Sequence, residues 1–478
     1  MSKLAKFNSF IAVIMLCAIS CSKEKDSNQA VTANVKSVVQ TKSAVLNFWK
    51  DNTTSVTTID ATPGYVKTII YTIGPISVAA NDVVTVHFQQ QTSYAGSDNV
   101  MIAAGVVIGS NSSVVDQTSS GFIGFASKHS GTNATTLEVG TQVTQRTGSY
   151  QFSQAYSGNV YINAVMYAAN LSGNPPGAVD PTLPSGYGEL VAVLESGVTR
   201  YEMNYQAFTA MSVSGNTWVN KTLGPINIAA NTMVDTRYEV EATTNTSMPD
   251  GDYNQRFGRW VSEGTSSTDM AGSRLIKPAQ IGGTHGKHHL MVSNAGGKFY
   301  SSATNNMYYN AVVYGYGWGN PGYPMTIEQS SDYLYGHFIV EMRNSSSGNY
   351  YADGSAKISS VVTTPQVLYT VGPIDIAAGQ VVEVRYMAGF NPTGTGYVTL
   401  VGKILRTTSP TATTGTEVLK GLSQIFHPYF TYTNMIHSTA ERPSTALTGQ
   451  YYNVVVQRTG GATSCPVMDW GKLEVIKR

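Results

Sequence analysis

Cysteine is almost absent from this sequence, and that absence limits how the fold can be held together. The chain has 3 cysteines among 478 residues. Cys17 and Cys21 lie in an N-terminal segment that we expect to be processed, which leaves Cys465 alone. An intramolecular disulfide is therefore excluded in the mature chain, and each domain must be held by its own core. Cys465 fits a small buried apolar residue better than a nucleophile.

Charge is also scarce. Charged residues make up 12% of the chain, and the formal net charge is +1. No basic stripe that could neutralise phosphates runs along the sequence, so nucleic acid is not an expected partner. Sparse charge combined with abundant Thr, Ser, Asn, Gly and Tyr is common in secreted all-β proteins.

The sequence motifs of common enzymes are missing as well. It contains no GxSxG elbow, Walker A loop, HExxH zinc motif or CxxC pair. The 29 acidic residues include candidates for the two carboxylates of a glycoside hydrolase, but their scarcity argues against a repeated hydrolytic site. We therefore predict no catalytic residue and no cofactor, and we keep a hydrolase with unmarked acidic residues as a third interpretation.

One motif is present in three copies. Residues 70–84, 220–234 and 368–382 share the pattern GPIxIAA or its close variant, and the glycines that begin it lie 150 and 148 residues apart. This spacing is too long for a solenoid repeat and matches a whole globular domain. Two further landmarks recur in the same order in each copy. One is a strand with a central Asn, at residues 161–165, 308–312 and 451–455, and the other is a terminal strand, at residues 188–193, 336–341 and 471–476. We place three domains at residues 45–198, 199–344 and 345–478.

The pattern within each unit predicts an all-β fold. Val83–Phe88 and Val381–Tyr386 alternate partly between apolar and polar residues, which indicates strands with one buried face. Gly-Pro is expected to end a preceding strand, and Asn81, Asn231 and Gly379, residues that tolerate positive φ, are expected to form a tight turn. We therefore predict three tandem β-sandwich domains, jelly-roll-like and produced by internal triplication, either closed into a pseudo-trimer or arranged as beads on a string.

The N-terminus has the features of a secretory signal. A basic start precedes an apolar run, Phe10–Ile19, that is too short to span a bilayer. The residues Ala18–Cys21 resemble the lipobox of bacterial lipoproteins, with Ala18 where the family usually has Leu. The resemblance implies that residues 1–20 are a signal peptide and that Cys21 is lipidated. The alternative is an ordinary signal peptide with Cys21 unmodified.

Residues 21–44 are predicted to be a lipidated, flexible tether. They are polar and lack aromatic residues, so they cannot bury enough apolar area to become ordered. The charges that follow Cys21 resemble the surface-export signals of Bacteroidota lipoproteins, and Ser22 resembles the residue found in lipoproteins sent to the outer membrane. We expect a lipid-anchored protein of the outer membrane, exposed at the cell surface.

The best binding candidate is an alternation of aromatic residues and glycines in the second unit. Residues 314–319 read YGYGWG, and on an extended strand the three rings point to one side. A row of rings can stack on the apolar faces of sugars, and the other two units lack it. We predict a glycan site here, with an inter-domain contact or an inward core row as the alternative. Its residues are Tyr314, Tyr316, Trp318 and Tyr323.

A histidine cluster is the weak candidate for a metal site. His285, His288 and His289 supply three imidazoles within five residues, but their spacing matches no zinc signature, so a solvated loop is the favoured interpretation.

An Asn recurs in the middle of one landmark strand. Asn163, Asn310 and Asn453 occupy equivalent positions. Their presence in all three copies favours a structural role, a hydrogen bond to a neighbouring loop backbone, over ligand contact.

The combined prediction is a surface-anchored, non-catalytic binding lipoprotein whose preferred ligand is an extracellular glycan. The alternative is a structural or adhesive surface protein that binds another protein.

Overall fold

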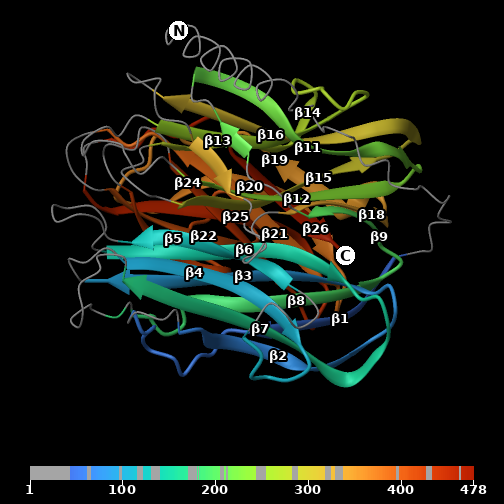
Figure 1. The fold of residues 1–478 in the computed structure, drawn as a ribbon, viewed down its shortest axis with the longest axis horizontal. Coiled ribbons are helices and arrows are strands. Elements are labelled where there is room, and N and C mark those ends of the chain that lie inside the picture. Colours follow the sequence, from blue (N-terminus) through green and yellow to red (C-terminus); the bar gives the residue numbers. More distant parts are fainter. Residues whose placement is uncertain are drawn as a thin grey trace, which may run out of the picture. The chain divides into compact units, whose positions relative to one another are not determined.

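The computed structural model describes most of the chain after residue 42. The described residues are 43–61, 66–95, 100–115, 122–130, 140–170, 180, 182–204, 209–211, 214–243, 255–282, 289–317, 325–328, 337–393, 398–426, 433–461 and 464–478. Their regular elements are strands, apart from the 3-10 turn η1 (Ser347–Asn349), so the fold is all-β as predicted (Figure 1). No helix among these residues is long and apolar enough to cross a membrane.

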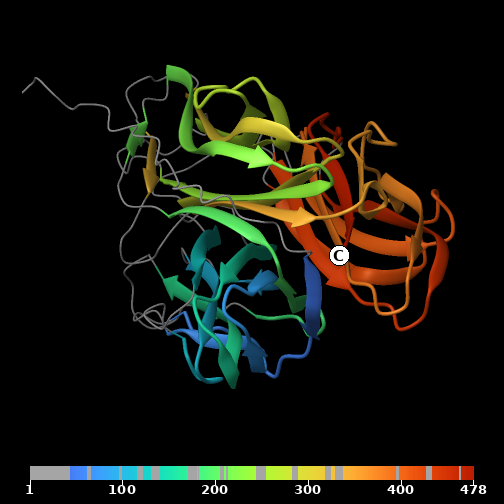
Figure 2. The same cartoon turned by 90° about the vertical axis from the view of Figure 1, so that its right-hand side faces the viewer.

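The first sheet pair lies between residues 44 and 196 and is coloured blue to green in Figure 2. One sheet has the order β1-β8-β3-β6 and the other β2-β7-β4-β5. Their strands are β1 (Ala44–Asp51), β2 (Thr68–Val78), β3 (Val83–Tyr94), β4 (Val100–Gly109), β5 (Phe122–Ser130), β6 (Gly140–Gln151), β7 (Tyr156–Asn170) and β8 (Gly188–Ser196).

The second sheet pair lies between residues 199 and 344. One sheet has the order β10-β17-β12-β18-β9, with β15 also paired to β12, and the other has the order β11-β16-β13-β14. Their strands are β9 (Thr199–Asn204), β10 (Thr209–Met211), β11 (Ser214–Ile228), β12 (Thr232–Thr243), β13 (Gln255–Gly264), β14 (Ser273–Gly282), β15 (His289–Tyr300), β16 (Thr304–Gly317), β17 (Met325–Glu328) and β18 (His337–Asn344).

The third sheet pair lies between residues 350 and 477 and is orange to red in Figure 2. Its sheets have the orders β19-β26-β21-β24 and β20-β25-β22-β23. Their strands are β19 (Tyr350–Asp353), β20 (Gln366–Ile376), β21 (Val382–Phe390), β22 (Val398–Thr407), β23 (Thr416–Phe426), β24 (Thr433–Glu441), β25 (Leu447–Gly460) and β26 (Lys472–Lys477).

The order of the strands repeats from one sheet pair to the next. In the first and third pairs, the first, eighth, third and sixth strands form one sheet, and the second, seventh, fourth and fifth form the other. The second pair has the same order, with the short strands β10 and β17 added to one sheet. We call the sheets that contain β3, β12 and β21 the inner sheets, and those that contain β4, β13 and β22 the outer sheets.

Each sheet pair encloses its own apolar cluster. The first is built from residues between Ile59 and Leu194, and the second from residues between Leu223 and Met342. The third is built from residues between Val361 and Val475, and it also takes in Val143 of β6. Three main apolar cores fit the lack of a disulfide among the described residues, because apolar burial can stabilise a domain of this size without a cross-link.

The Gly-Pro step does not end a strand, and that prediction was wrong. β2 continues through it to Val78, with a shift in its pairing to β7 between Ile73 and Ile76. Gly74 has φ +147, and a Cβ there would lie 2.8 Å from the Val160 carbonyl oxygen, so only glycine fits. The three Gly-Pro bonds are cis. The motif therefore forms a bulge against the neighbouring strand.

The turn after the motif is confirmed. Asn81, Asn231 and Gly379 have φ values of 69°, 57° and 73°. Asn and Gly are the residues that adopt this left-handed conformation most readily, so the sequence specifies the entry into β3, β12 and β21.

Candidate functional site

The prediction that β3 and β21 bury only one face was wrong. Val84, Val86 and Phe88 point into the first core, as the alternation indicates. Thr85 and His87, on the opposite face, are fully buried as well. The reason is that the outward faces of the three inner sheets contact one another, as the hydrogen bonds between His87 and Ser438 and between Arg343 and Glu195 show.

A set of buried charges fills these contacts, and we call it the central charge cluster. It contains five carboxylates and four guanidinium groups from β8, β12, β18, β21, β26 and the residue after β26. Its members are Glu195, Asp235, Arg237, Glu341, Arg343, Glu383, Arg385, Glu474 and Arg478.

Asp235 connects two sheet pairs. Its Oδ1 accepts a hydrogen bond of 2.5 Å from Arg385 Nη2, and its Oδ2 accepts one of 2.9 Å from Arg478 Nη2. Arg343 Nη1, on the neighbouring strand of the same sheet, lies 3.3 Å from Oδ2. Buried charges are tolerated when they are paired and hydrogen-bonded, and Asp235 meets both conditions.

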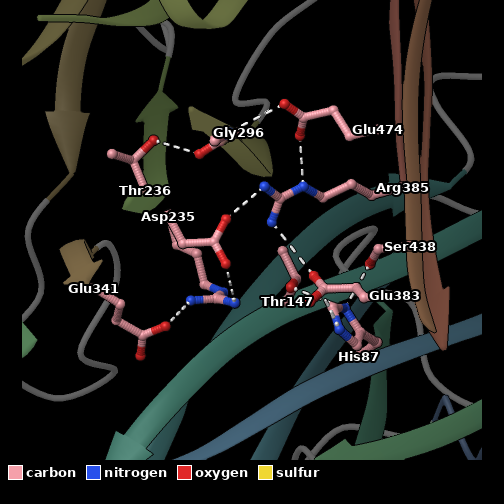
Figure 3. Close-up of polar contacts among 12 residues, drawn as sticks. His87, Thr147, Asp235, Thr236, Gly296, Glu341, Glu383, Arg385, Ser438 and Glu474 are labelled. Atoms are coloured by element: carbon pink, nitrogen blue, oxygen red, sulfur yellow. Dashed lines mark hydrogen bonds and ion pairs between the residues drawn. The ribbon is translucent and has the colours of Figure 1, made fainter. Parts of the chain in front are cut away.

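Arg385 shows how densely the groups are interlocked (Figure 3). Its Nε donates to Glu474 Oε2 at 2.6 Å, and its Nη1 donates to Glu383 Oε1 at 3.3 Å. Together with Asp235, one guanidinium group thus binds three carboxylates. A planar fork with five donors suits this arrangement, which an ammonium group cannot reproduce.

Glu195 joins the first sheet pair to the other two. Arg343 donates to both of its oxygens, at 2.9 Å from Nε and 2.8 Å from Nη2, and Arg478 Nη1 lies 3.1 Å from Oε2. Equivalent positions in the three inner sheets hold these three side chains. Glu195 lies opposite Val83 on the neighbouring strand, Arg343 lies opposite Met233, and Arg478 lies opposite Val381.

His87 extends the cluster into the first sheet pair. Its Nδ1 lies 3.0 Å from Ser438 Oγ and 3.2 Å from Thr147 Oγ1, and its Nε2 lies 3.4 Å from Glu383 Oε1. Burial lowers the pKa of His87 to about 4, although Glu383 opposes the shift. The imidazole is therefore neutral at neutral pH.

Asp235 and Glu383 are held ionised by the arginines around them. Burial alone would raise the pKa of Asp235, but Arg385 and Arg478 outweigh it and hold the pKa well below its ordinary value. The same balance, led by Arg478, lowers the pKa of Glu383 to about 2. A general acid needs a raised pKa and access to substrate. Asp235 and Glu383 have neither, so the role that the geometry gives the central charge cluster is to hold the inner sheets together.

The recurring asparagines have the structural role that was predicted. In each sheet pair, the side-chain nitrogen of the Asn donates to two carbonyl oxygens of the loop that follows β4, β13 or β22. The side-chain oxygen of the Asn accepts a hydrogen bond from a Thr. For Asn453, the acceptors are Ser409 at 3.0 Å and Ala412 at 2.9 Å, and the donor is Thr370 at 2.7 Å. Asn163 and Asn310 make the corresponding bonds. We call this the loop clamp.

Cys465 is fully buried, and burial raises the pKa of its thiol to about 12. A thiol with that pKa carries almost no thiolate at neutral pH, which confirms the prediction of a buried apolar residue over a nucleophile.

The predicted aromatic row falls largely outside the described residues. Trp318, Tyr323 and the side chain of Tyr316 lie outside them, whereas Tyr314 in β16 is half-buried. Tyr314 does not belong to the second core, which contains Val313. It lies on the outward face of an outer sheet, so the predicted glycan site remains a prediction.

The other predicted sites are also outside the description. These are Cys21, His285, His288 and the side chain of His289. Among the residues that the structure does describe, no group of three or more His, Cys, Asp or Glu is placed to hold a metal ion.

The outward face of the third outer sheet carries a groove of about 410 Å³. The side chains that point outward from β22 and β25 are those of Val401, Lys403, Val455 and Gln457, whereas the adjacent residues Leu400, Ile404, Val454 and Val456 point into the core. Val455 and Gln457 lie two and four residues after Asn453, as Val312 and Tyr314 lie after Asn310. The groove thus occupies the face on which the sequence placed the aromatic row in the second unit.

Tyr187, from the first sheet pair, forms one edge of this groove. The residue is 42% exposed, and no other aromatic residue is among the exposed large hydrophobic residues of the described chain. Its backbone is fixed, because its carbonyl accepts from Gln91 N at 2.9 Å and its N–H donates to Pro184 O at 3.3 Å. The ring is therefore presented on a held turn. Glu417, Lys420 and Gly421 of β23 and Pro365 complete the lining.

Sequence reasoning missed Tyr187, although a signal for it exists. An aromatic residue followed by glycine precedes the terminal strand in each unit, as Tyr187-Gly188, Tyr335-Gly336 and Trp470-Gly471. Trp470 packs on its own sheet, where its Nε1 donates to Asn434 Oδ1 at 3.2 Å. Tyr335 lies outside the described residues. Only packing between sheet pairs turns Tyr187 toward a groove.

Comparisons with known proteins add little. No protein-family model matches the chain, and no curated protein is similar enough to count as a relative. Among solved structures, the infectious bursal disease virus Gx strain has 9% identity and a TM-score of 0.21, with 92% of this chain and 82% of that chain covered. The T=3 Penaeus vannamei nodavirus has 11% identity, coverage of 68% and 97%, and a TM-score of 0.17. Similarity at these scores carries no argument about fold or function.

Proposed function

We propose that the chain is a non-catalytic glycan-binding lipoprotein, anchored by lipid on Cys21 and exposed at the surface of an outer membrane. We further propose that residues 45–198, 199–344 and 345–478 are jelly-roll-like domains that arose by triplication. The shared motif, the equal strand order of the three sheet pairs and the repeated loop clamp support this origin.

The observation that carries the binding function is the groove edged by Tyr187. Its volume of about 410 Å³ is of the order found for small-molecule sites. Binding a sugar takes a ring that can stack on the apolar face of the pyranose, together with polar groups that bond the hydroxyls. Tyr187 offers the ring, and Gln457, Lys403 and Glu417 offer the polar groups.

Binding without catalysis is preferred over hydrolysis because of the carboxylates. Glycoside hydrolysis usually needs two of them across the scissile bond. The described lining of the groove holds one, Glu417. The carboxylates of the central charge cluster are buried and bound to arginines, so they are not available to a substrate.

A glycan array with the soluble residues 45–478 tests the function, followed by calorimetry on any oligosaccharide that binds. Tyr187→Ala is expected to weaken binding about tenfold or more, as truncation of a central aromatic contact does. Tyr187→Phe keeps the ring and should retain most of the affinity. Leu46→Ala, a change at another exposed apolar residue, is the control and should leave binding unchanged. An array without any binding overturns the proposal.

The anchor is tested separately with Cys21→Ala in cell fractionation. A lipoprotein cysteine carries several acyl chains, so attachment should be stable to washing with high salt and lost in the variant. A variant that still sediments with membranes after such a wash contradicts the lipid anchor and leaves the glycan proposal standing.

A further inference from the structure

We infer that the groove edged by Tyr187 binds an acidic saccharide, a sugar chain that carries carboxylate or sulfate groups. The inference rests on the proposed glycan-binding function and adds the chemical class of the ligand. It is carried by the position and the pairing of two lysines, Lys403 and Lys420, that line the groove.

Lys420 is the first of these cations. It is exposed on β23, and within the described part of the chain it has neither an ion-pair partner nor a hydrogen-bond partner. A Cβ placed on Gly186 would lie 2.9 Å from Lys420 Nζ, so the ammonium group lies against the residue that precedes Tyr187. The cation and the aromatic ring therefore face the groove from neighbouring positions.

Lys403 is the second cation. Its Nζ lies 3.7 Å from Glu417 Oε1, and the Glu417 side chain is 45% exposed. An ion pair of this length, with one partner largely open to solvent, contributes little to stability. A ligand anion can replace Glu417 as the partner of Lys403 at little cost. The two lysines and one glutamate give the described lining a net charge of +1.

The rest of the groove suits a sugar ring. Val401 and Val455 provide an apolar floor between the charged groups. Gln457 Nε2 donates to the Thr363 carbonyl at 2.7 Å, which fixes the amide and leaves its oxygen to accept from a hydroxyl. An anionic group near the lysines and a ring on Tyr187 can thus be held at the same time.

The inference is tested by calorimetry on the full chain in detergent. The probes are oligogalacturonate and a sulfated heparin oligosaccharide, compared with a neutral cello-oligosaccharide of the same length. An acidic probe is expected to bind about tenfold more tightly than the neutral one, and this preference should fall as salt is raised from 50 to 500 mM, because salt screens exposed charges. Whether the carboxylate or the sulfate probe binds identifies the source of the negative charge.

Three variants assign the preference to this groove. Lys420→Gln should weaken binding of the acidic probe about fivefold, and the double change with Lys403→Gln should abolish the preference over the neutral probe. Lys477→Gln, on the opposite sheet, is the control and should bind as the unmodified chain does. Since Lys420 is exposed, the melting temperature should not change.

Each other outcome overturns the inference in a recognisable way. If the neutral probe binds equally well and depends on Tyr187 but on neither lysine, glycan binding stands and the acidic ligand is wrong. Acidic binding that survives all three groove changes, at Tyr187, Lys403 and Lys420, places the site elsewhere. If no saccharide binds, the inference and the proposed function fail together.

Discussion

Arg478 Nη2 donates a hydrogen bond of 2.9 Å to Asp235 Oδ2 across 243 residues of chain. Arg385 binds the other oxygen of the same carboxylate from 150 residues away. Both guanidinium groups come from the third sheet pair, whereas Asp235 lies in the second. Since Arg343 of the second pair binds Glu195 of the first, one continuous set of ion pairs joins all three.

Asp235→Asn is expected to destabilise the protein by about 3–5 kcal/mol, because removing one partner leaves buried cations without compensation. The melting temperature measured by circular dichroism should fall by several degrees. Lys357→Ala is the control, since it breaks the ion pair between the exposed Lys357 and the half-buried Asp353 and should change stability by less than about 1 kcal/mol. Equal effects of the two changes would show that Asp235 contributes no more to stability than the pair between Lys357 and Asp353.

Gly372→Ala should be far more damaging than Gly449→Ala. Both glycines have positive φ, +146° and +62°. A Cβ on Gly372 would lie 2.5 Å from the Gln450 carbonyl oxygen, whereas one on Gly449 meets nothing within 4 Å. We expect a loss of about 1 kcal/mol at Gly449, from backbone conformation alone, and several times more at Gly372. Chemical denaturation compares them, and similar losses would contradict the steric argument.

Asn453→Ala should open the loop that follows β22. It removes three hydrogen bonds and leaves two carbonyls, of Ser409 and Ala412, without their donor, at a cost of about 1–3 kcal/mol. Amide exchange should accelerate in this loop before it does in the core. Asn47→Ala, which loses only a bond to the adjacent Phe48 N–H, is the control and should leave exchange there unchanged.

Stability should decline as the pH falls below about 6.5, the ordinary histidine pKa. The lowered pKa of His87, about 4, means that the unfolded chain takes up this proton first, so His87 favours the native state fully above pH 6.5 and progressively less down to pH 4. The lowered pKa of Glu383, about 2, extends the decline from pH 4.5 downward.

His87→Gln tests the histidine part of this dependence. Between pH 6.5 and 4, its melting temperature should fall less steeply than that of the unmodified chain, by the equivalent of about 2–3 kcal/mol over the window. The loss of stability below pH 4.5, which protonation of the carboxylates causes, should remain in this variant. Identical pH profiles of the two proteins would exclude His87 as a source.

Local features were predictable because short stretches of sequence determine them. The turn at Asn81 follows from the residues that tolerate positive φ, and the structural role of Asn453 follows from its recurrence in an apolar strand. The burial of His87 was not predictable. A polar residue that alternates with valines has the same pattern whether it faces water or another sheet, and its partner Ser438 lies 351 residues away. Tyr187 and Lys420 are likewise brought together only by packing between sheet pairs.

The register position shared by Glu195, Arg343 and Arg478 carries one negative and two positive charges. Three copies of any single sheet pair, assembled as identical subunits, would bring three like charges together at this point. The chain avoids that repulsion by having three different occupants, and the difference gives each sheet pair its own set of neighbours. If the chain were cut between the sheet pairs, these charges would favour an assembly of one copy of each sheet pair over assemblies of three identical copies.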